Sequence, residues 1–183
     1  NRGIGKNYYK TDESPVTQHL FLIDLLTKSI SLYQGNEQID IPAKRFLYSV
    51  KTISDLILLI GKNKNNLIYC NSKSKTIERA YSLAQQLPND ISTPELKNAI
   101  IQIKDYIHPD YYLAELLEHK TAYHYGRLPQ LIRNLVEDLY KSEKINNVFC
   151  TSTLLEGVNM PTQNIFILDN KNGRKNLEPI DFW

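Results

Sequence analysis

The sequence predicts an α/β fold in which a mainly parallel sheet is flanked by helices. Four short apolar runs, each of the length expected for a buried strand, begin near residues 67, 122, 147 and 164. Helical stretches, with apolar residues at three- and four-residue spacing, separate these runs. Parallel strands need a long crossover, usually a helix, so this alternation predicts βα crossovers and one parallel sheet.

Composition and charge are those of a globular protein of 183 residues, long enough for one domain with a sizeable core. The net charge of +2 permits nucleic acid binding without requiring it. Cys70 and Cys150 lie far apart at the ends of apolar runs, which predicts buried reduced thiols and argues against a metal site. No apolar run approaches about 18 residues, so we expect no membrane partner and a cytoplasmic protein. The start has neither an initiator Met nor a signal-peptide pattern, which indicates a piece of a longer protein.

The first third of the chain carries the weakest signals. Residues 1–17 are polar and are expected to lead in from a preceding domain. Residues 18–33 fit either of two structures: a pair of strands with Lys28 near the turn, or a single helix. From Pro42 onward, apolar residues at helical spacing predict one helix that ends at Gly61.

The first predicted strand of the parallel sheet, 66–70, runs into a polar turn over 71–75. A helix from about 76 to 87 follows. The amides of the turn, Ser72 and the start of the helix could hold a backbone phosphate. The alternative is an ordinary helix cap by Asn71 or Ser72, which needs no ligand.

Residues 90–119 form a polar-faced helical stretch that looks like an insertion between the first crossover helix and the second strand. Thr93 and Pro94 start one helix in the favoured way, with threonine as the cap and proline at the first position. The break at 108–110 precedes a second short helix. The two histidines of this stretch lack partners at metal-ligand spacing, so we interpret both as surface or capping residues.

The next predicted strand and turn, 121–126, precede another helix. Tyr125 could meet a base or phosphate at the carboxyl edge of the sheet. Two interpretations of His124 remain open: it lies along the same binding edge, or it is a structural histidine whose hydrogen bonds are made within the protein. For Arg133 we favour an ion pair with Glu137, its i+4 neighbour on the helix.

The third predicted strand, 147–150, runs directly into three consecutive hydroxyl side chains: Thr151, Ser152 and Thr153. Gly157 then lets the backbone come close to a ligand, and Pro161 stops any helix. In open α/β sheets, ligands gather at the carboxyl ends of the strands. The pattern therefore predicts a binding site where this strand ends.

Three stretches resemble superfamily 2 helicases. The sequence TSTLLEGVNMP over 151–161 resembles motif V in the form found in Ski-like DExH enzymes. The polar turn at 71–75 resembles motif IV, and AYHYGRLPQLIRNLVEDLY over 122–140 resembles the segment with a His-x-Gly turn and a following arginine. The final IDFW resembles the lead into motif VI, so the resemblance covers 67–183 and stops short of that motif.

This resemblance implies a RecA-like domain of the P-loop NTPase type, namely the second motor domain of an ATP-dependent DNA or RNA helicase. It would span 18–183, with the helical insertion around 90–119, and would be truncated before motif VI. Its implied partners are single-stranded or duplex nucleic acid and the N-terminal RecA-like domain of the same chain. ATP and Mg²⁺ would bind the full-length protein. This fragment alone would bind neither and hold no catalytic residue, because GxxxxGK[ST], DExH and motif VI are absent from its sequence.

The motif match also implies roles for individual residues. The nucleic-acid track would be lined by Cys70, Asn71, Ser72, His124, Tyr125, Gly126, Thr151, Ser152 and Thr153. The ATP cleft would be faced by Glu156, Gly157 and Asn159. Asn159 stands where DEAD-box relatives carry an acidic residue, although an amide can still bond a ribose hydroxyl. Contacts to the backbone carry no base information, so the domain is expected to track along a strand.

A different class of function also fits the sequence. A RecA-like domain without its own catalytic motifs could serve as a nucleic-acid clamp or a protein-docking module. A generic doubly wound nucleotide-binding domain is disfavoured, because no GxGxxG follows any predicted strand.

Overall fold

The computed structural model describes residues 19–34, 37–155 and 160–177. The chain divides into two compact units, Asn1–Thr52 and Ile53–Trp183. The assignment of 18–183 to one helicase domain stays a prediction.

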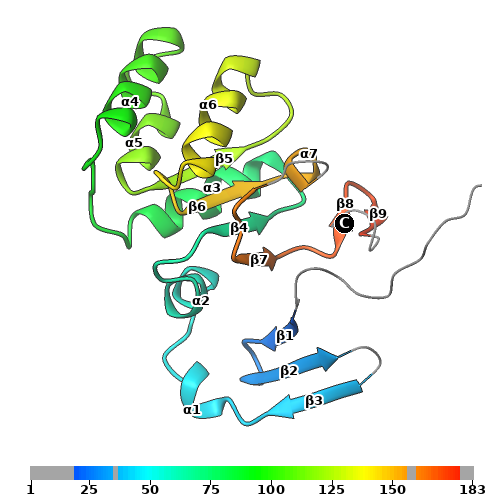
Figure 1. The fold of residues 1–183 in the computed structure, drawn as a ribbon. Coiled ribbons are helices and arrows are strands. Elements are labelled where there is room, and N and C mark those ends of the chain that lie inside the picture. Colours follow the sequence, from blue (N-terminus) through cyan, green and yellow to red (C-terminus); the bar gives the residue numbers. More distant parts are fainter. Residues whose placement is uncertain (1–18, 35–36, 156–159, 178–183) are drawn as a thin grey trace, which may run out of the picture. The chain divides into compact units, whose positions relative to one another are not determined.

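The first unit contains a three-stranded antiparallel sheet in the order β1-β2-β3 (Figure 1). Its strands are β1 (Leu20–Asp24), β2 (Ser29–Gln34) and β3 (Glu37–Ile41). Residues 20–34 are thus a strand pair rather than a helix. Asp24 makes the turn, since its Oδ1 accepts from the Leu26 and Thr27 amides at 2.7 and 3.2 Å. Lys28 completes the turn with φ +56°.

The single helix predicted from Pro42 to Gly61 is wrong in its middle. The structure has α1 (Lys44–Leu47) and α2 (Ile53–Ile60), with no helix over 48–52. The backbone of Val50 explains the break: its amide bonds the Leu47 carbonyl in a tight turn at 3.1 Å, and its carbonyl accepts from the Lys28 ammonium. Helix α2 ends directly before Gly61, as predicted, and glycine suits this position because a Cβ there would lie 2.7 Å from the Ile57 carbonyl oxygen.

The second unit is built on a four-stranded parallel sheet, which confirms the predicted α/β, RecA-like fold class. Its order is β5-β6-β4-β7 (Figure 1). The strands are β4 (Asn66–Tyr69), β5 (Thr121–His124), β6 (Asn147–Cys150) and β7 (Asn164–Ile167). All residues of β4, β5 and β6 are buried, whereas β7 is a half-exposed edge strand.

Helices flank this sheet and complete the core of the second unit (Figure 1). They are α2 together with α3 (Lys73–Ala84), α4 (Pro94–Tyr106), α5 (Tyr112–Glu118), α6 (Gln130–Lys141) and the short α7 (Ser152–Leu155). Helices α3, α5 and α6 contact β5, while α4 packs on α5 and α6. The predicted insertion is therefore the pair α4 and α5, and Thr93 caps α4 by accepting from the Leu96 amide at 3.3 Å.

Strand β3 of the first unit was not predicted from the sequence, and neither were the following features of the second unit. A small hairpin, β8 (Lys171–Asn172) with β9 (Lys175–Asn176), follows β7. Three asparagines link adjacent strands at their amino ends: Asn66 Nδ2 donates to Asn147 Oδ1 at 2.8 Å, and Asn164 Nδ2 donates to Asn66 Oδ1 at 2.9 Å. These paired amides satisfy buried polar atoms and fix the register of three strands.

Candidate nucleic-acid interface

The carboxyl ends of the three buried strands meet at one edge of the sheet. Tyr69 on β4 is in register with Cys150 on β6, which is in register with His124 on β5. The ladder continues past the strand ends, since the Cys70 amide donates to the Cys150 carbonyl at 2.8 Å and the Thr151 amide donates to the His124 carbonyl at 3.2 Å. The three predicted stretches, 70–72, 124–126 and 151–153, therefore lie together (Figure 1).

The turns after β5 and β6 are in direct contact. A Cβ added to Gly126 would lie 3.0 Å from the Cγ2 methyl of Thr153, so the absence of a side chain lets these turns approach. The hydroxyls of Thr151 and Thr153 lie 3.3 Å apart. Thr153 and Gly126 are exposed and Thr151 is half-buried, so this contact offers hydroxyls and backbone to solvent.

Burial separates the predicted track residues into two groups. The side chains of Cys70, His124 and Tyr125 are enclosed, with 0%, 2% and 7% of their surface exposed. The accessible members are Asn71, Ser72, Gly126, Thr151, Ser152 and Thr153. In this structure, contact with a strand would have to come from the second group, while the first group supports the edge from within.

Ser72 is the N-cap of α3, as one of the two interpretations of this turn required. Its Oγ accepts from the Lys75 amide at 3.4 Å, and its carbonyl accepts from the Thr76 hydroxyl at 2.8 Å. The helix consequently begins at Lys73, three residues before its predicted start. An exposed cap at a helix N-terminus is also compatible with a bound phosphate, so the alternative role is still a prediction.

Glu137 pairs with His124 and not with Arg133, which corrects the predicted ion pair. His124 Nε2 lies 3.1 Å from Glu137 Oε1, and the Lys141 ammonium lies 3.8 Å from the other carboxylate oxygen. Arg133 instead donates to the Gln130 side chain. The Glu137 carboxylate thus serves the more deeply buried of the two groups, since His124 is 2% exposed whereas Arg133 is half-buried.

Desolvation sets the pKa values of the enclosed groups. Burial lowers the pKa of His124, although its contact with Glu137 opposes this. Burial raises the pKa of the Tyr125 hydroxyl, and hydrogen bonding to Tyr111 raises it further. The Tyr125 ring stacks on the Tyr123 ring, with 5.8 Å between their centroids. The Lys73 ammonium lies 5.0 Å from the centroid of the Tyr125 ring. Tyr125 is therefore engaged by its own chain.

Asp169, at the end of β7, is a site residue that the sequence analysis missed. Its carboxylate accepts from the Asn71 amide at 3.0 Å and from the Lys75 ammonium at 2.8 Å, and lies 3.6 Å from Arg79. Burial alone would raise its pKa, but the bonds from Lys75 and Asn71 outweigh it and hold the pKa below the ordinary value. The available signal was its place immediately after the fourth apolar run, where parallel strands deliver polar groups.

The predicted cleft residues Glu156, Gly157 and Asn159 lie outside the described residues. Both cysteines, in contrast, are free and buried as predicted. In the described ranges, no group of three or more His, Cys, Asp or Glu side chains could hold a metal ion. No helix in those ranges is long and apolar enough to cross a membrane.

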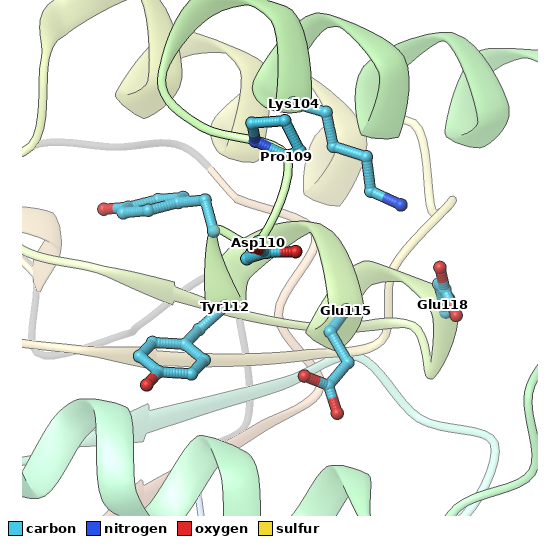
Figure 2. Close-up of a pocket in the computed structure, with 7 residues that line it drawn as sticks. Lys104, Pro109, Asp110, Tyr112, Glu115 and Glu118 are labelled. Atoms are coloured by element: carbon cyan, nitrogen blue, oxygen red, sulfur yellow. The ribbon is translucent and has the colours of Figure 1, made fainter.

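A hollow of about 330 Å³ lies in the helical insertion at α4 and α5 (Figure 2). It is lined by Lys104, Pro109, Asp110, Tyr111, Tyr112, Glu115 and Glu118. Glu115 already accepts from the Tyr81 hydroxyl at 2.9 Å, and Glu118 from the Asn89 side chain at 3.0 Å. Three carboxylates against one ammonium repel phosphates, so this hollow is a poorer candidate for a nucleic acid than the sheet edge.

The chain is similar in sequence to several known proteins. The chain is 28% identical to Anti-bacteriophage protein B of Escherichia coli K12 over 113 residues, which is 61% of this chain and 15% of that protein. It is 27% identical to the ATP-dependent DNA helicase homolog MER3 of Arabidopsis thaliana over 128 residues, 67% of this chain and 11% of that protein. It is also 27% identical to the ATP-dependent DNA helicase Hel308 of Pyrobaculum calidifontis over 107 residues, 56% of this chain and 15% of that protein.

The chain is thus similar to superfamily 2 helicases over part of its length, and it spans at most 15% of the length of these relatives. No family model matches it. The similarity supports a helicase-related domain of α/β fold.

Proposed function

We propose that this chain is the second RecA-like motor domain of an ATP-dependent helicase of the Ski-like type, and that it binds the backbone of DNA or RNA at the carboxyl edge of its parallel sheet. The observation that carries the proposal is the contact between the Gly126 turn and Thr153, beside the turn that follows β4. Hydroxyls and turn backbone at one accessible edge suit phosphate and sugar contacts, which position a strand without reading its sequence.

In this proposal the domain spans 18–183 and works opposite an N-terminal RecA-like domain of the full-length protein. ATP and Mg²⁺ would be held mainly by that other domain. The cleft role stays assigned to Glu156, Gly157 and Asn159 on the motif match alone, and no described residue is given a step in hydrolysis. The contribution of the described residues is to bind and orient one strand.

Binding of the chain to a labelled oligonucleotide tests the interface. A fluorescein-labelled single strand of mixed sequence, as DNA and as RNA, is titrated with wild-type protein and with Thr151→Val/Thr153→Val, and the anisotropy is measured. Valine keeps the shape and removes two hydroxyls, each worth about 1 kcal/mol in a hydrogen bond, so we expect binding weakened roughly 5- to 30-fold. Ser142→Ala, at the far end of α6, is the matched control and should bind like wild type.

Strand-dependent ATP hydrolysis tests the motor role. The full-length protein should hydrolyse ATP faster when a strand is present, and Gly157→Asp should abolish that stimulation. The 183-residue chain alone should hydrolyse no ATP. Strand binding without hydrolysis by the full-length protein would instead establish a non-catalytic clamp, and turnover by the isolated chain would contradict the division of roles between two domains.

A further inference from the structure

The side chain of Asn71 clamps a backbone peptide 102 residues further along the chain. Its Nδ2 donates to the Gly173 carbonyl at 3.0 Å, and its Oδ1 accepts from the Gly173 amide at 2.6 Å. The Asn71 side-chain amide thus donates to and accepts from the backbone of one residue, as a neighbouring β-strand would. Both polar atoms of the Asn71 side chain are used in this contact.

Gly173 is the turn residue of the hairpin formed by β8 and β9, with φ +63°. A left-handed conformation of this kind suits glycine, so the chain can expose both backbone atoms to one side chain here. Two further contacts tie the same segment to the end of β4. Asp169 accepts from the Asn71 amide at 3.0 Å, and the Tyr69 hydroxyl donates to the Lys171 carbonyl at 2.6 Å.

The clamped hairpin carries three exposed cations, Lys171, Arg174 and Lys175. Within the described ranges, none of the three forms an ion pair, whereas Lys75 and Arg79 nearby are both engaged by Asp169. The hairpin follows the carboxyl end of β7 (Figure 1) and is fixed by Asn71 to the turn after β4, which places it at the edge where the proposed strand binds. Exposed cations held at that edge attract phosphates.

We propose that Asn71 is a positioning residue, which holds this cationic hairpin at the strand-binding edge and does not itself contact the strand. The inference rests on the proposed backbone binding and changes the role that the motif match gives to Asn71. The two bonds to Gly173 use one N–H and one lone pair of the Asn71 amide and fix its plane against the hairpin, so the orientation of this side chain is set by Gly173 and not by a bound strand.

A thermodynamic cycle separates the two roles. Oligonucleotide binding is measured for wild type, for Asn71→Ala, for the triple variant Lys171→Gln/Arg174→Gln/Lys175→Gln, and for all four changes together. The slope of log K against log [NaCl] is negative, and each lost single-strand phosphate contact makes it less steep by about 0.7, so the triple variant should make it less negative by about 2. Asn71→Ala should weaken binding roughly 3- to 10-fold in the wild-type background and have no further effect in the triple background, because coupled residues are non-additive.

An equal loss from Asn71→Ala in both backgrounds would show that Asn71 acts on the strand directly, and would overturn the inference. If wild-type protein bound no oligonucleotide, the proposed function would fail and the positioning role would fall with it. Thermal unfolding of each variant by circular dichroism ensures that only folded proteins are compared.

Hydrogen exchange provides a readout that does not depend on nucleic acid. The Gly173 amide should be protected in wild type, exchange at least about tenfold faster in Asn71→Ala because its acceptor is gone, and be unchanged in Ser72→Ala. Asn71→Asp keeps the acceptor and removes the donor, so it should retain protection at this amide. Equal exchange of Gly173 in wild type and Asn71→Ala would show that the clamp does not hold the hairpin, which again overturns the inference.

Discussion

His124 Nε2 lies 3.1 Å from Glu137 Oε1, and this contact joins the end of β5 to α6. The imidazole is 2% exposed, and its Nδ1 has no hydrogen-bond partner among the described residues. Glu137 is therefore the group that satisfies a buried histidine directly beneath the proposed strand-binding edge. Its loss would disturb the edge from within.

Replacing Glu137 with alanine should destabilise the fold. The change leaves the buried His124 Nε2 without its partner, and an unsatisfied buried polar group costs about 1–3 kcal/mol. Urea unfolding followed by circular dichroism measures the free energy. Asp138→Ala, at the exposed neighbouring position, should stay within about 0.5 kcal/mol of wild type. Equal stability of the two variants would argue against a structural role for the His124–Glu137 contact.

Stability should fall in mildly acid solution because of His124. Burial lowers the pKa of the folded-state imidazole below its ordinary value of 6.5, so the unfolded chain binds the proton more tightly. The contribution of His124 is therefore complete above about pH 6.5 and is lost as the pH falls towards the folded-state pKa. Urea unfolding between pH 5 and 8 should show this slope in wild type and a shallower one in His124→Gln. A steeper acid loss in the variant would contradict the assignment.

Gly126→Ala should weaken the edge through Thr153. The added methyl would lie 3.0 Å from Thr153 Cγ2, tighter than ordinary contact, and overpacking of this kind costs roughly 1–3 kcal/mol. We expect lower thermal stability and weaker oligonucleotide binding by anisotropy. Thr153→Ser removes the obstructing methyl and keeps the hydroxyl, so the double variant should recover most of both losses. Failure of that rescue would place the effect of Gly126→Ala elsewhere.

Asn66→Ala should be among the most damaging substitutions in the sheet. Asn66 is 1% exposed, its Nδ2 donates to the Gly61 carbonyl and to Asn147, and its Oδ1 accepts from Asn164. Removing this side chain leaves several buried polar atoms without hydrogen-bond partners. We therefore expect the free energy of unfolding, measured in urea, to fall by about 2–4 kcal/mol. Lys62→Ala, on the exposed loop nearby, is the control and should cost less than about 0.5 kcal/mol.

Neither thiol should react in the folded protein. Cys70 and Cys150 are both 0% exposed, and burial raises the pKa of each. Less thiolate and no access both slow attack on a disulfide reagent. Ellman's reagent at pH 8 should label no cysteine in buffer and two in urea. Rapid labelling of one thiol in buffer would reveal local opening at the carboxyl edge of β4 or β6.

The parallel sheet and its binding edge follow from local sequence. Four apolar runs of strand length, separated by crossover stretches, dictate parallel pairing, and parallel pairing brings the residues after each run to one edge. The turns at 71–72, 124–126 and 151–153 could therefore be placed together without coordinates. The start of α4 after Thr93 follows from an equally local rule of capping, whereas the Ser72 cap of α3 was one of two open interpretations.

The sequence alone left other features undecided, because they depend on contacts between distant residues. Helical spacing runs through 44–60, yet a turn at Val50, whose carbonyl is bonded by Lys28, divides it into two helices. The i+4 rule favours Arg133 as the partner of Glu137, but a histidine buried by the whole core takes its place.

The sequence by itself thus determined the fold class, the sheet edge and the residue types gathered there, since periodicity and turn chemistry are local properties. Only the tertiary structure decided which of those residues are accessible and which partners they hold. Burial encloses Cys70, His124 and Tyr125, while Asn71 is engaged by a glycine 102 residues away. Contacts of this kind form between residues that are far apart in the sequence, so local sequence patterns do not predict them.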